Sequence, residues 1–307
     1  MKAAIDIGTN TVLLLVAEII DGSMLLRHEE QRTPRLGKGV DADGVINEAA
    51  TQRVISALKE YKAFLEADFP NVDDTIVTAT SAVRDAANRN EFQAQIKEET
   101  GFQVRLLSGI EEAEWTAAGA LSMLKKEYKS DALILDIGGG STEVALMEDG
   151  NLSGSHSFDM GSVRFTERFL KGNPPDLNEI EACRNEIEKQ YSSYPINSAP
   201  KTNAVGVAGT VTTLAAITLN LNRYESSAIN NYKITKESLE DAVKLFSTKS
   251  HEELLNMAPN VLKGREDIFL AGLLILDGFM SHYNFNHLIV STGGIRHGAI
   301  LKNKKKR

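Results

Sequence analysis

Cysteine is almost absent from this chain, which contains only Cys183 among 307 residues. A single cysteine excludes an intrachain disulfide and a zinc cluster built from cysteines. Because Ile180, Cys183 and Ile187 follow helical spacing, we expect the thiol to pack inside the protein as a small apolar group. The six histidines show no metal-ligand spacing. Neither residue type therefore predicts a metal site.

Long hydrophobic runs are also lacking, and the 42 acidic residues outnumber the 34 lysines and arginines. No apolar segment approaches the ~20 residues that cross a bilayer, and the chain begins with a strand pattern rather than a signal peptide. We therefore expect a cytoplasmic protein without a membrane partner. The net charge of −8 argues against broad nucleic-acid binding, so a polyanionic ligand would need local positive groups or metal ions. The basic tail at 302–307 is either a solvated end or a tether for such a ligand.

Two stretches of sequence, around Asp6 and Asp136, are nearly alike. Each is a short apolar run that ends in the aspartate, followed by glycine and small hydroxyl residues and then by a second apolar run. The second run closes at an Asp-Gly pair in both copies, Asp21–Gly22 and Asp149–Gly150. This pattern predicts a buried strand, a tight turn and a returning strand, present twice.

A second pair of elements supports an internal duplication. Thr75–Ser81 is a β-branched run that leads into a helix-prone segment, and Ala204–Thr210 does the same in the second half. Thr80 and Gly209 lie 129 positions apart, nearly the 130 that separate the two aspartates. Two pairs of elements at nearly one offset favour duplication over coincidence.

The length of the chain favours two domains, each able to bury an ordinary core. We place them at 1–125 and 126–307, with a last helix at about 296–307 that packs back on the first domain. Strand and helix patterns alternate as in an α/β protein. Helices are expected at 48–67, 90–100, 108–128, 179–194, 236–247 and 264–283, strands at 104–107 and 288–291, and a linker at 195–202.

The two small-residue turns are the first candidate site. Gly138, Gly139, Gly140, Ser141 and Thr142 can present several N–H groups to one anion, because glycine tolerates the backbone angles of a tight nest. Gly8, Thr9, Asn10 and Thr11 would do this less freely but add side-chain donors. A plain hairpin turn is the alternative. Three consecutive glycines are costly for a turn that only reverses the chain, and we therefore expect a phosphate site.

Three carboxylates accompany these turns. Asp6 and Asp136 end apolar strands at equivalent points, where a carboxylate needs a partner. A hard divalent cation that bridges to phosphate oxygens would supply one, whereas the alternative is that each aspartate caps its own turn. Glu143 follows the Ser-Thr pair closely enough to join the same metal or water, and a solvent-facing position is equally compatible with its spacing.

Further charged and small residues lie at predicted helix starts. Glu111 and Glu112 are adjacent acids in a first helical turn, so one can cap the helix while the other serves as a general base. Arg84 follows a strand, where its guanidinium could hold a phosphate oxygen. Gly209 and Thr210 form a strand-to-helix turn with free N–H groups, a common helix start that is also an anion site.

Taken in order, these motifs resemble the exopolyphosphatase and guanosine pentaphosphate phosphatase family, within the superfamily of actin-like ATPases and sugar kinases. The resemblance covers nearly the whole chain. It rests on the segments Asp6–Thr11, Thr80–Ala86, Leu107–Ala113, Asp136–Glu143, Met160–Arg164, Gly209–Thr212 and Gly293–Gly298.

The resemblance implies two ribonuclease-H-like α/β lobes from an internal duplication, with a cleft between them. It implies that Glu112 is the base that activates water, that Asp136 and Glu143 are Mg²⁺-associated carboxylates, with Mn²⁺ as the alternative metal, and that both turns and Arg84 bind phosphate. Many members carry serine where this chain has Thr9 and Thr11, a change that keeps the hydroxyl. Longer members have further helical domains, so this chain resembles the short type.

The leading hypothesis is a phosphoanhydride hydrolase that acts on inorganic polyphosphate or guanosine pentaphosphate in the stringent response. A sensor that binds guanosine penta- or tetraphosphate without turnover is the alternative, and a kinase is a third. The sequence does not rank the two substrates. It also leaves the oligomeric state open, with a homodimer among the options.

Overall fold

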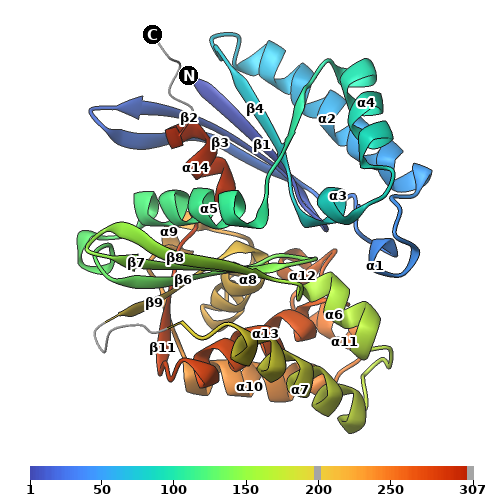
Figure 1. Cartoon of the computed structure of the whole chain (residues 1–307), viewed down its shortest axis with the longest axis vertical. Helices are drawn as coiled ribbons and strands as arrows, with labels where there is room; N and C mark the ends of the chain where they lie inside the picture. The colour runs from blue at the N-terminus through green and yellow to red at the C-terminus, as the bar shows by residue number, and fades with distance from the viewer. Residues whose placement is uncertain (197–201, 303–307) are drawn as a thin grey trace. The chain divides into compact units, whose positions relative to one another are not determined.

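The computed structural model describes residues 1–196 and 202–302, which divide into two compact units. Unit 1 consists of Met1–Ser122 together with Gly293–Arg307, and unit 2 is the continuous segment Met123–Thr292. Figure 1 shows a twisted sheet with helices packed against it in each unit. The chain therefore passes twice from one unit to the other.

Unit 1 contains a five-stranded mixed sheet with the order β3-β2-β1-β4-β5. Strand β1 pairs antiparallel with β2 and parallel with β4, so a hairpin and a parallel layer share one central strand. Its elements are β1 (Lys2–Ile7), β2 (Val12–Ile20), β3 (Ser23–Arg32), α1 (Val40–Asp43), α2 (Glu48–Asp68), β4 (Thr75–Ala79), α3 (Ser81–Asp85), α4 (Arg89–Thr100), β5 (Val104–Leu106), α5 (Gly109–Met123) and α14 (Ile295–Lys302).

Both faces of the unit 1 sheet are buried at β1 and along most of β2, which is why these two strands are almost continuously apolar. Successive side chains of a strand point to opposite faces. Ile5 and Leu14 accordingly join the core under α2 and α4, whereas Ala4 and Leu15 join a second cluster with Trp115 of α5 and residues of α14.

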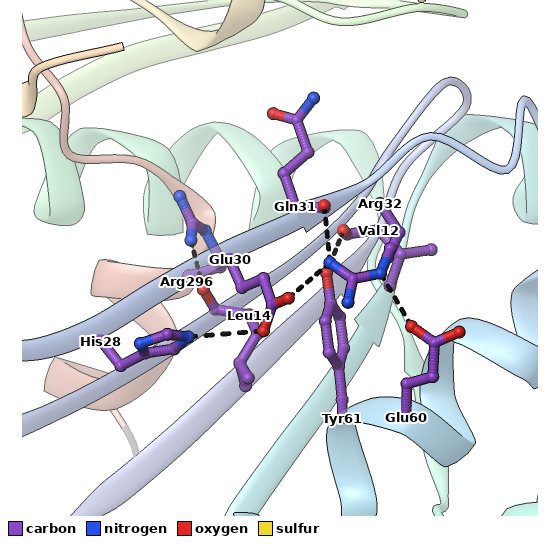
Figure 2. Close-up of polar contacts among 9 residues, drawn as sticks. All are labelled: Val12, Leu14, His28, Glu30, Gln31, Arg32, Glu60, Tyr61 and Arg296. Atoms are coloured by element: carbon purple, nitrogen blue, oxygen red, sulfur yellow. Dashed lines mark hydrogen bonds and ion pairs between the residues drawn. The ribbon is translucent and has the colours of Figure 1, made fainter. Parts of the chain in front are cut away.

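The C-terminal helix α14 belongs to unit 1 and is anchored by Arg296. Its Nη1 donates to the Leu14 carbonyl at 2.7 Å, and its Nη2 lies 3.3 Å from a Glu29 carboxylate oxygen. The Tyr61 hydroxyl of α2 donates to the carbonyl of Val12 at 2.9 Å (Figure 2). One hydrogen bond thus joins β2 to α14 at Leu14, and another joins it to α2 at Val12. Residues 303–307 of the predicted last helix lie outside the described residues.

Unit 2 has a six-stranded mixed sheet with the order β10-β11-β9-β6-β7-β8. It packs on one large core that includes the long apolar helix α13. Its elements are β6 (Ala132–Ile137), β7 (Thr142–Glu148), β8 (Asn151–Phe158), α6 (Ser162–Phe169), α7 (Leu177–Ser193), β9 (Asn203–Val207), α8 (Ala208–Thr218), α9 (Ser226–Ile229), β10 (Lys233–Thr235), α10 (Lys236–Ser247), α11 (His251–Met257), α12 (Pro259–Leu262), α13 (Phe269–His282) and β11 (His287–Val290), preceded by a 3₁₀ turn at Lys126–Tyr128.

The backbone repeats itself in the two units as the sequence predicted. Gly8 N–H donates to the Thr11 carbonyl at 2.9 Å, and Gly138 N–H donates to the Ser141 carbonyl at 3.0 Å. The second and third strands shift register between residues 16 and 17 in unit 1 and between 146 and 147 in unit 2, again 130 positions apart. Each unit is therefore a ribonuclease-H-like α/β lobe of the actin-like type, and the internal duplication is confirmed.

The closing turns of the two hairpins also match. Asp21 and Asp149 both have φ 49°, and the glycines that follow them have φ 77° and 75°. Two consecutive residues with positive φ suit a tight hairpin turn, because such turns follow the right-handed twist of the strands. The Asp-Gly pairs therefore end both hairpins as expected.

Two helix limits differ from the prediction. Helix α5 ends at Met123 rather than near Tyr128, because Lys125 is extended (ψ 152°) and its N–H donates to the Asn231 side chain. Helix α13 begins at Phe269 rather than at Gly264, where φ of 83° interrupts a right-handed helix. Most of the expected linker, 197–201, lies outside the described residues. Within the described ranges, no helix combines the length and apolar character needed to cross a membrane.

Candidate active site

The second glycine turn has its carbonyl groups fixed by the start of α6. The Gly138 carbonyl accepts from the Ser162 N–H at 2.9 Å, and the Gly139 carbonyl accepts from the Val163 N–H at 2.9 Å. These donors are the first N–H groups of a helix, which have no partner inside the helix. With the Arg164 N–H, which also donates to the Gly139 carbonyl at 3.0 Å, three backbone hydrogen bonds hold the turn from one side.

The N–H groups of the same turn are unused. Within residues 1–196 and 202–302, those of Gly139, Gly140 and Ser141 donate to no protein group. The Ser141 hydroxyl is buried and likewise forms no hydrogen bond with the described residues. Buried donors without a partner are costly, and a group of backbone N–H donors is an anion-binding concavity. The turn can therefore bind a phosphate oxygen.

The segment that holds the turn requires a glycine. A Cβ atom on Gly161 would lie 2.4 Å from the Gly139 carbonyl oxygen. In addition, the Thr142 hydroxyl donates to the carbonyl of Met160 at 2.7 Å. The Met160–Arg164 motif, to which sequence reasoning gave no role, thus supports the glycine turn. The glycine followed by a helix start was the available signal.

The first turn follows the same plan with other partners. The carbonyls of Thr9 and Asn10 accept from the N–H groups of Gly37 and Arg35, at 2.7 and 3.0 Å. The Thr9 hydroxyl lies 3.1 Å from the Ser81 hydroxyl. Loop 33–39 therefore takes the place that the start of α6 has in unit 2.

Two buried carboxylates face one another beside the second turn. Asp136 on β6 and Glu143 on β7 are directly opposed partners of an antiparallel pair, which places their side chains on one face of the sheet. They are 6% and 1% exposed, respectively. One oxygen of Glu143 accepts from the Ser157 hydroxyl at 2.6 Å. A pair of opposed like charges is destabilising unless a proton or a cation offsets the repulsion.

The equivalent position of unit 1 lacks the second carboxylate. Asp6 is opposed to Leu13 across the hairpin. Its carboxylate accepts from the Thr78 hydroxyl on β4 at 3.0 Å. Only unit 2 therefore has a carboxylate pair at its turn, although both copies retain the strand-end aspartate.

This donor set fits a magnesium ion. Mg²⁺ is usually held by one or two carboxylates together with water and phosphate oxygens. Asp136 and Glu143 supply two carboxylates, and the hydroxyl of Ser141 is available to a phosphate or a water nearby. No group of three or more His, Cys, Asp or Glu side chains is arranged around a common point within the described ranges. Substrate and water would therefore have to complete the coordination.

The adjacent acids of α5 are separated by the structure. Glu111 accepts from the Ser108 N–H at 3.0 Å and from Arg105 at 2.7 Å. These hydrogen bonds, first that of the Ser108 backbone and then that of Arg105, lower the pKa of Glu111 to about 2. Glu111 is therefore the helix-capping acid.

Glu112 points inward instead. It is 4% exposed, and one of its carboxylate oxygens lies 3.0 Å from Nη1 of Arg84. The same Arg84 nitrogen donates to the carbonyl of Leu107 at 3.0 Å. The structure thus brings Arg84 and Glu112 together within unit 1. A base and a cation in contact can serve one phosphate and its attacking water.

An arginine that sequence reasoning missed, Arg265, contacts the start of α8. Nη1 of Arg265 donates to the Gly209 carbonyl at 2.9 Å and to the Thr213 hydroxyl at 2.8 Å. Burial lowers the pKa of Arg265. Thr210 packs closely against Gly272, since a Cβ atom on Gly272 would lie 2.3 Å from the Thr210 hydroxyl oxygen. Arg265 lies in an irregular segment without a motif, so no sequence signal marked it.

Three known proteins are similar to this chain over 90% or more of its length. Exopolyphosphatase 2 of Mycobacterium tuberculosis is 33% identical over 90% of this chain and 88% of that protein. The guanosine-5′-triphosphate,3′-diphosphate pyrophosphatase of Pseudoalteromonas translucida is 28% identical over 97% of this chain, which spans 58% of that protein. The bifunctional 3-dehydroquinate synthase/phosphatase of Fusobacterium nucleatum is 29% identical, and the chain spans 46% of its length.

Solved structures give the same result. The crystal structure of the Aquifex aeolicus member of the Ppx/GppA family matches 99% of this chain and 98% of that chain, with a TM-score of 0.81 and 29% identity. An exopolyphosphatase from Cytophaga hutchinsonii matches 97% of this chain and 96% of that chain, with a TM-score of 0.85 and 25% identity. The family model for the Ppx/GppA phosphatase family matches residues 15–307. This chain belongs to the Ppx/GppA phosphatase family.

Proposed function

We propose that the chain hydrolyses the terminal phosphoanhydride of inorganic polyphosphate or the bond to the 5′-terminal phosphate of guanosine pentaphosphate. The observation that carries the proposal is the glycine turn with unused N–H groups beside the opposed Asp136–Glu143 pair. A binding turn alone would suit any phosphate. A buried carboxylate pair beside it suits a metal-assisted reaction at that phosphate. The similarity to exopolyphosphatase 2 and to a guanosine-5′-triphosphate,3′-diphosphate pyrophosphatase supports the substrate class.

In this proposal unit 2 holds the reacting phosphate. The N–H groups of the turn and the Ser141 hydroxyl donate to its oxygens, and Asp136 and Glu143 hold Mg²⁺. When bound, the ion would offset negative charge on the phosphoryl oxygens. The turn is rigid before substrate binds, because α6 already fixes its carbonyls. Preorganised donors of this kind stabilise developing charge without rearrangement.

Glu112 is the proposed general base. Its carboxylate takes a proton from water while the water oxygen attacks the terminal phosphorus atom. The bridging P–O bond breaks, and its electron pair leaves with the remaining phosphate chain. Arg84 orients the Glu112 carboxylate through their 3.0 Å contact and contributes positive charge to the phosphate. Gly8–Thr11, Gly209 and Thr210 are proposed as further phosphate-binding positions, and Asp6 is proposed as a further metal-binding carboxylate.

The test is a phosphate-release assay on short polyphosphate, long polyphosphate and guanosine pentaphosphate, with and without Mg²⁺. We expect release from at least one of them that depends on the metal. Glu112→Gln should lower kcat at least about 100-fold, as expected for a general base, while the ligand still binds. Glu111→Gln is the matched control and should retain activity, because Glu111 caps the helix.

Two results would overturn the proposal. Full activity of Glu112→Gln would show that Glu112 is not the general base, even if the protein hydrolyses one of the substrates. Tight binding of guanosine penta- or tetraphosphate without turnover of any of the three substrates would identify a sensor instead.

A further inference from the structure

Two consecutive asparagines in unit 2 hold both chain segments that connect the units. One connection runs through Met123, the first residue of unit 2, and the other through Thr292, its last residue. Asn230 donates from Nδ2 to the Met123 carbonyl at 2.8 Å and accepts at Oδ1 from the Thr292 N–H at 3.1 Å. One side chain therefore bridges the two connections.

Asn231 repeats the arrangement two residues further along each connection. Its Oδ1 accepts from the Lys125 N–H at 2.9 Å, and its own N–H donates to the Val290 carbonyl at 2.8 Å. Asn231 has φ 64°, a left-handed conformation that asparagine adopts more readily than most residues. The four hydrogen bonds link two segments that lie more than 160 residues apart in sequence.

Unit 1 holds the same two segments by close glycine contacts. On α5, a Cβ at Gly119 would lie 2.0 Å from the Gly294 carbonyl oxygen. On α14, a Cβ at Gly298 would lie 2.0 Å from the Trp115 carbonyl oxygen. Only glycine permits backbones to approach this closely. The two connections are thus held together in unit 1 by the glycine contacts and in unit 2 by the asparagines.

We propose that Asn230 and Asn231 form a clamp that makes the two connections act as one hinge. With both segments held in unit 2 by the clamp and in unit 1 by the glycine contacts, the hinge is confined to the short stretch between these contacts, around Ser122–Met123 and Thr292–Gly293. The clamp therefore limits the range of motion between the units. This inference needs no substrate and does not depend on the proposed reaction.

Two substitutions test the clamp. Asn230→Asp keeps the size of the side chain but replaces the donor that faces the Met123 carbonyl by an oxygen. Asn231→Gly removes the side-chain acceptor and preserves the left-handed backbone. An open pocket of about 640 Å³, lined by Lys125, Ser226 and both asparagines among others, gives a carboxylate at position 230 access to water. We therefore expect both variants to fold.

The chain offers matched controls. Asn88 makes the same pair of bonds to Ile46 alone, donating to its carbonyl at 2.8 Å and accepting from its N–H at 2.9 Å. Asn88→Asp thus breaks an equivalent bridge that holds neither connection. Asn284 has φ 58° and lies away from the connections in sequence, so Asn284→Gly controls for the second substitution.

The readout is the distribution of distances between spin labels at Ala63→Cys in α2 and Glu240→Cys in α10, measured by double electron–electron resonance. Both positions are exposed. The native Cys183 is buried, and burial raises the pKa of its thiol to about 12, so it should stay unlabelled. We expect Asn230→Asp and Asn231→Gly to broaden the distribution at least about twofold, and the controls to leave it unchanged.

Hydrogen exchange provides the internal check. The amide of Lys125 should exchange at least about tenfold faster in Asn231→Gly, which removes its acceptor. Faster exchange with an unchanged distance distribution would overturn the proposal, because the clamp would then be broken without effect on the motion. Broadening in Asn88→Asp as large as in Asn230→Asp would overturn it as well.

Discussion

Asp136 and Glu143 are directly opposed across the β6–β7 hairpin, whereas the matching aspartate of unit 1, Asp6, is opposed to Leu13. The duplicated hairpins therefore differ at one cross-strand position that decides whether a carboxylate pair exists. Opposed carboxylates repel one another, and a cation bound between them offsets that repulsion.

Mg²⁺ is expected to stabilise the protein through Glu143. A ligand that binds only the native state, present at about 100 times its Kd, raises the free energy of unfolding by about 2.7 kcal/mol. We expect wild-type protein to show a higher Tm with Mg²⁺ and Glu143→Gln to lose most of that shift. Thermal unfolding with Mg²⁺ or a chelator measures it. Glu148→Gln, at the exposed end of the same strand, is the control. Equal shifts in wild type and Glu143→Gln would contradict the metal assignment.

Gly161→Ala is expected to disable the second turn. The new methyl group would lie 2.4 Å from the Gly139 carbonyl oxygen, so the turn must move. Overpacking of this kind typically costs about 1–3 kcal/mol, and we expect kcat/KM for phosphate release to fall at least about tenfold. Chemical denaturation and steady-state kinetics measure the two effects. Gly154→Ala meets no atom within 4 Å and should change neither.

Unit 1 should lose stability in acid through Glu111. Its pKa is lowered from 4.5 to about 2 by hydrogen bonds from Ser108 and Arg105, so the folded state binds fewer protons than the unfolded state. The stabilisation is complete above pH 4.5 and declines as the pH falls towards about 2. The free energy of unfolding against pH should be flatter over that range in Glu111→Gln. The exposed Glu98→Gln of α4 should leave the profile as in wild type.

His297 gives a second pH dependence, centred at higher pH. Burial, aided by the charge of Arg296, lowers the pKa of this histidine from 6.5 to about 3. The unfolded chain then takes up a proton that the folded protein excludes, so this contribution is intact above pH 6.5 and declines towards pH 3. The slope approaches about 1.4 kcal/mol per pH unit for one proton.

The variant His297→Asn tests this assignment. Its side-chain oxygen can still accept from the Gly294 N–H, as Nδ1 of the histidine does at 3.3 Å. Denaturant unfolding between pH 7 and pH 4 should show a smaller pH slope in the variant. An identical slope would place the titrating group elsewhere.

The sequence was most informative where local chemistry determines the backbone. The Asp-Gly turns and the strand-end aspartates depend on residues within a few positions, and each is present in the structure. The end of α5 was misplaced because it depends on Asn231, a contact 106 residues away. Helix α6 was missed because its role, holding the glycine turn, is visible only in three dimensions.

The same distinction applies to the candidate site. The adjacency of Glu111 and Glu112 predicted that one would cap the helix and the other would face inward. Only the contacts with Arg105 and Arg84 show that Glu111 caps and that Glu112 faces inward. The opposition of Asp136 and Glu143 follows from the hairpin register, which a four-residue turn determines. The catalytic and metal-binding roles of these residues stay predictions until the variants are measured.

The return of α14 to unit 1 has a consequence for how the protein is made. Unit 2 is continuous and is complete in sequence once Thr292 has been synthesised, whereas unit 1 needs α14, which is made after unit 2. Until then the sheet face that carries Ala4 and Leu15 lacks its cover of Ile295, Ala299 and Ile300. Domains tend to fold as units during synthesis. The N-terminal unit should therefore finish folding after the unit that follows it on the ribosome, with its apolar face exposed to chaperones or to aggregation in the interval.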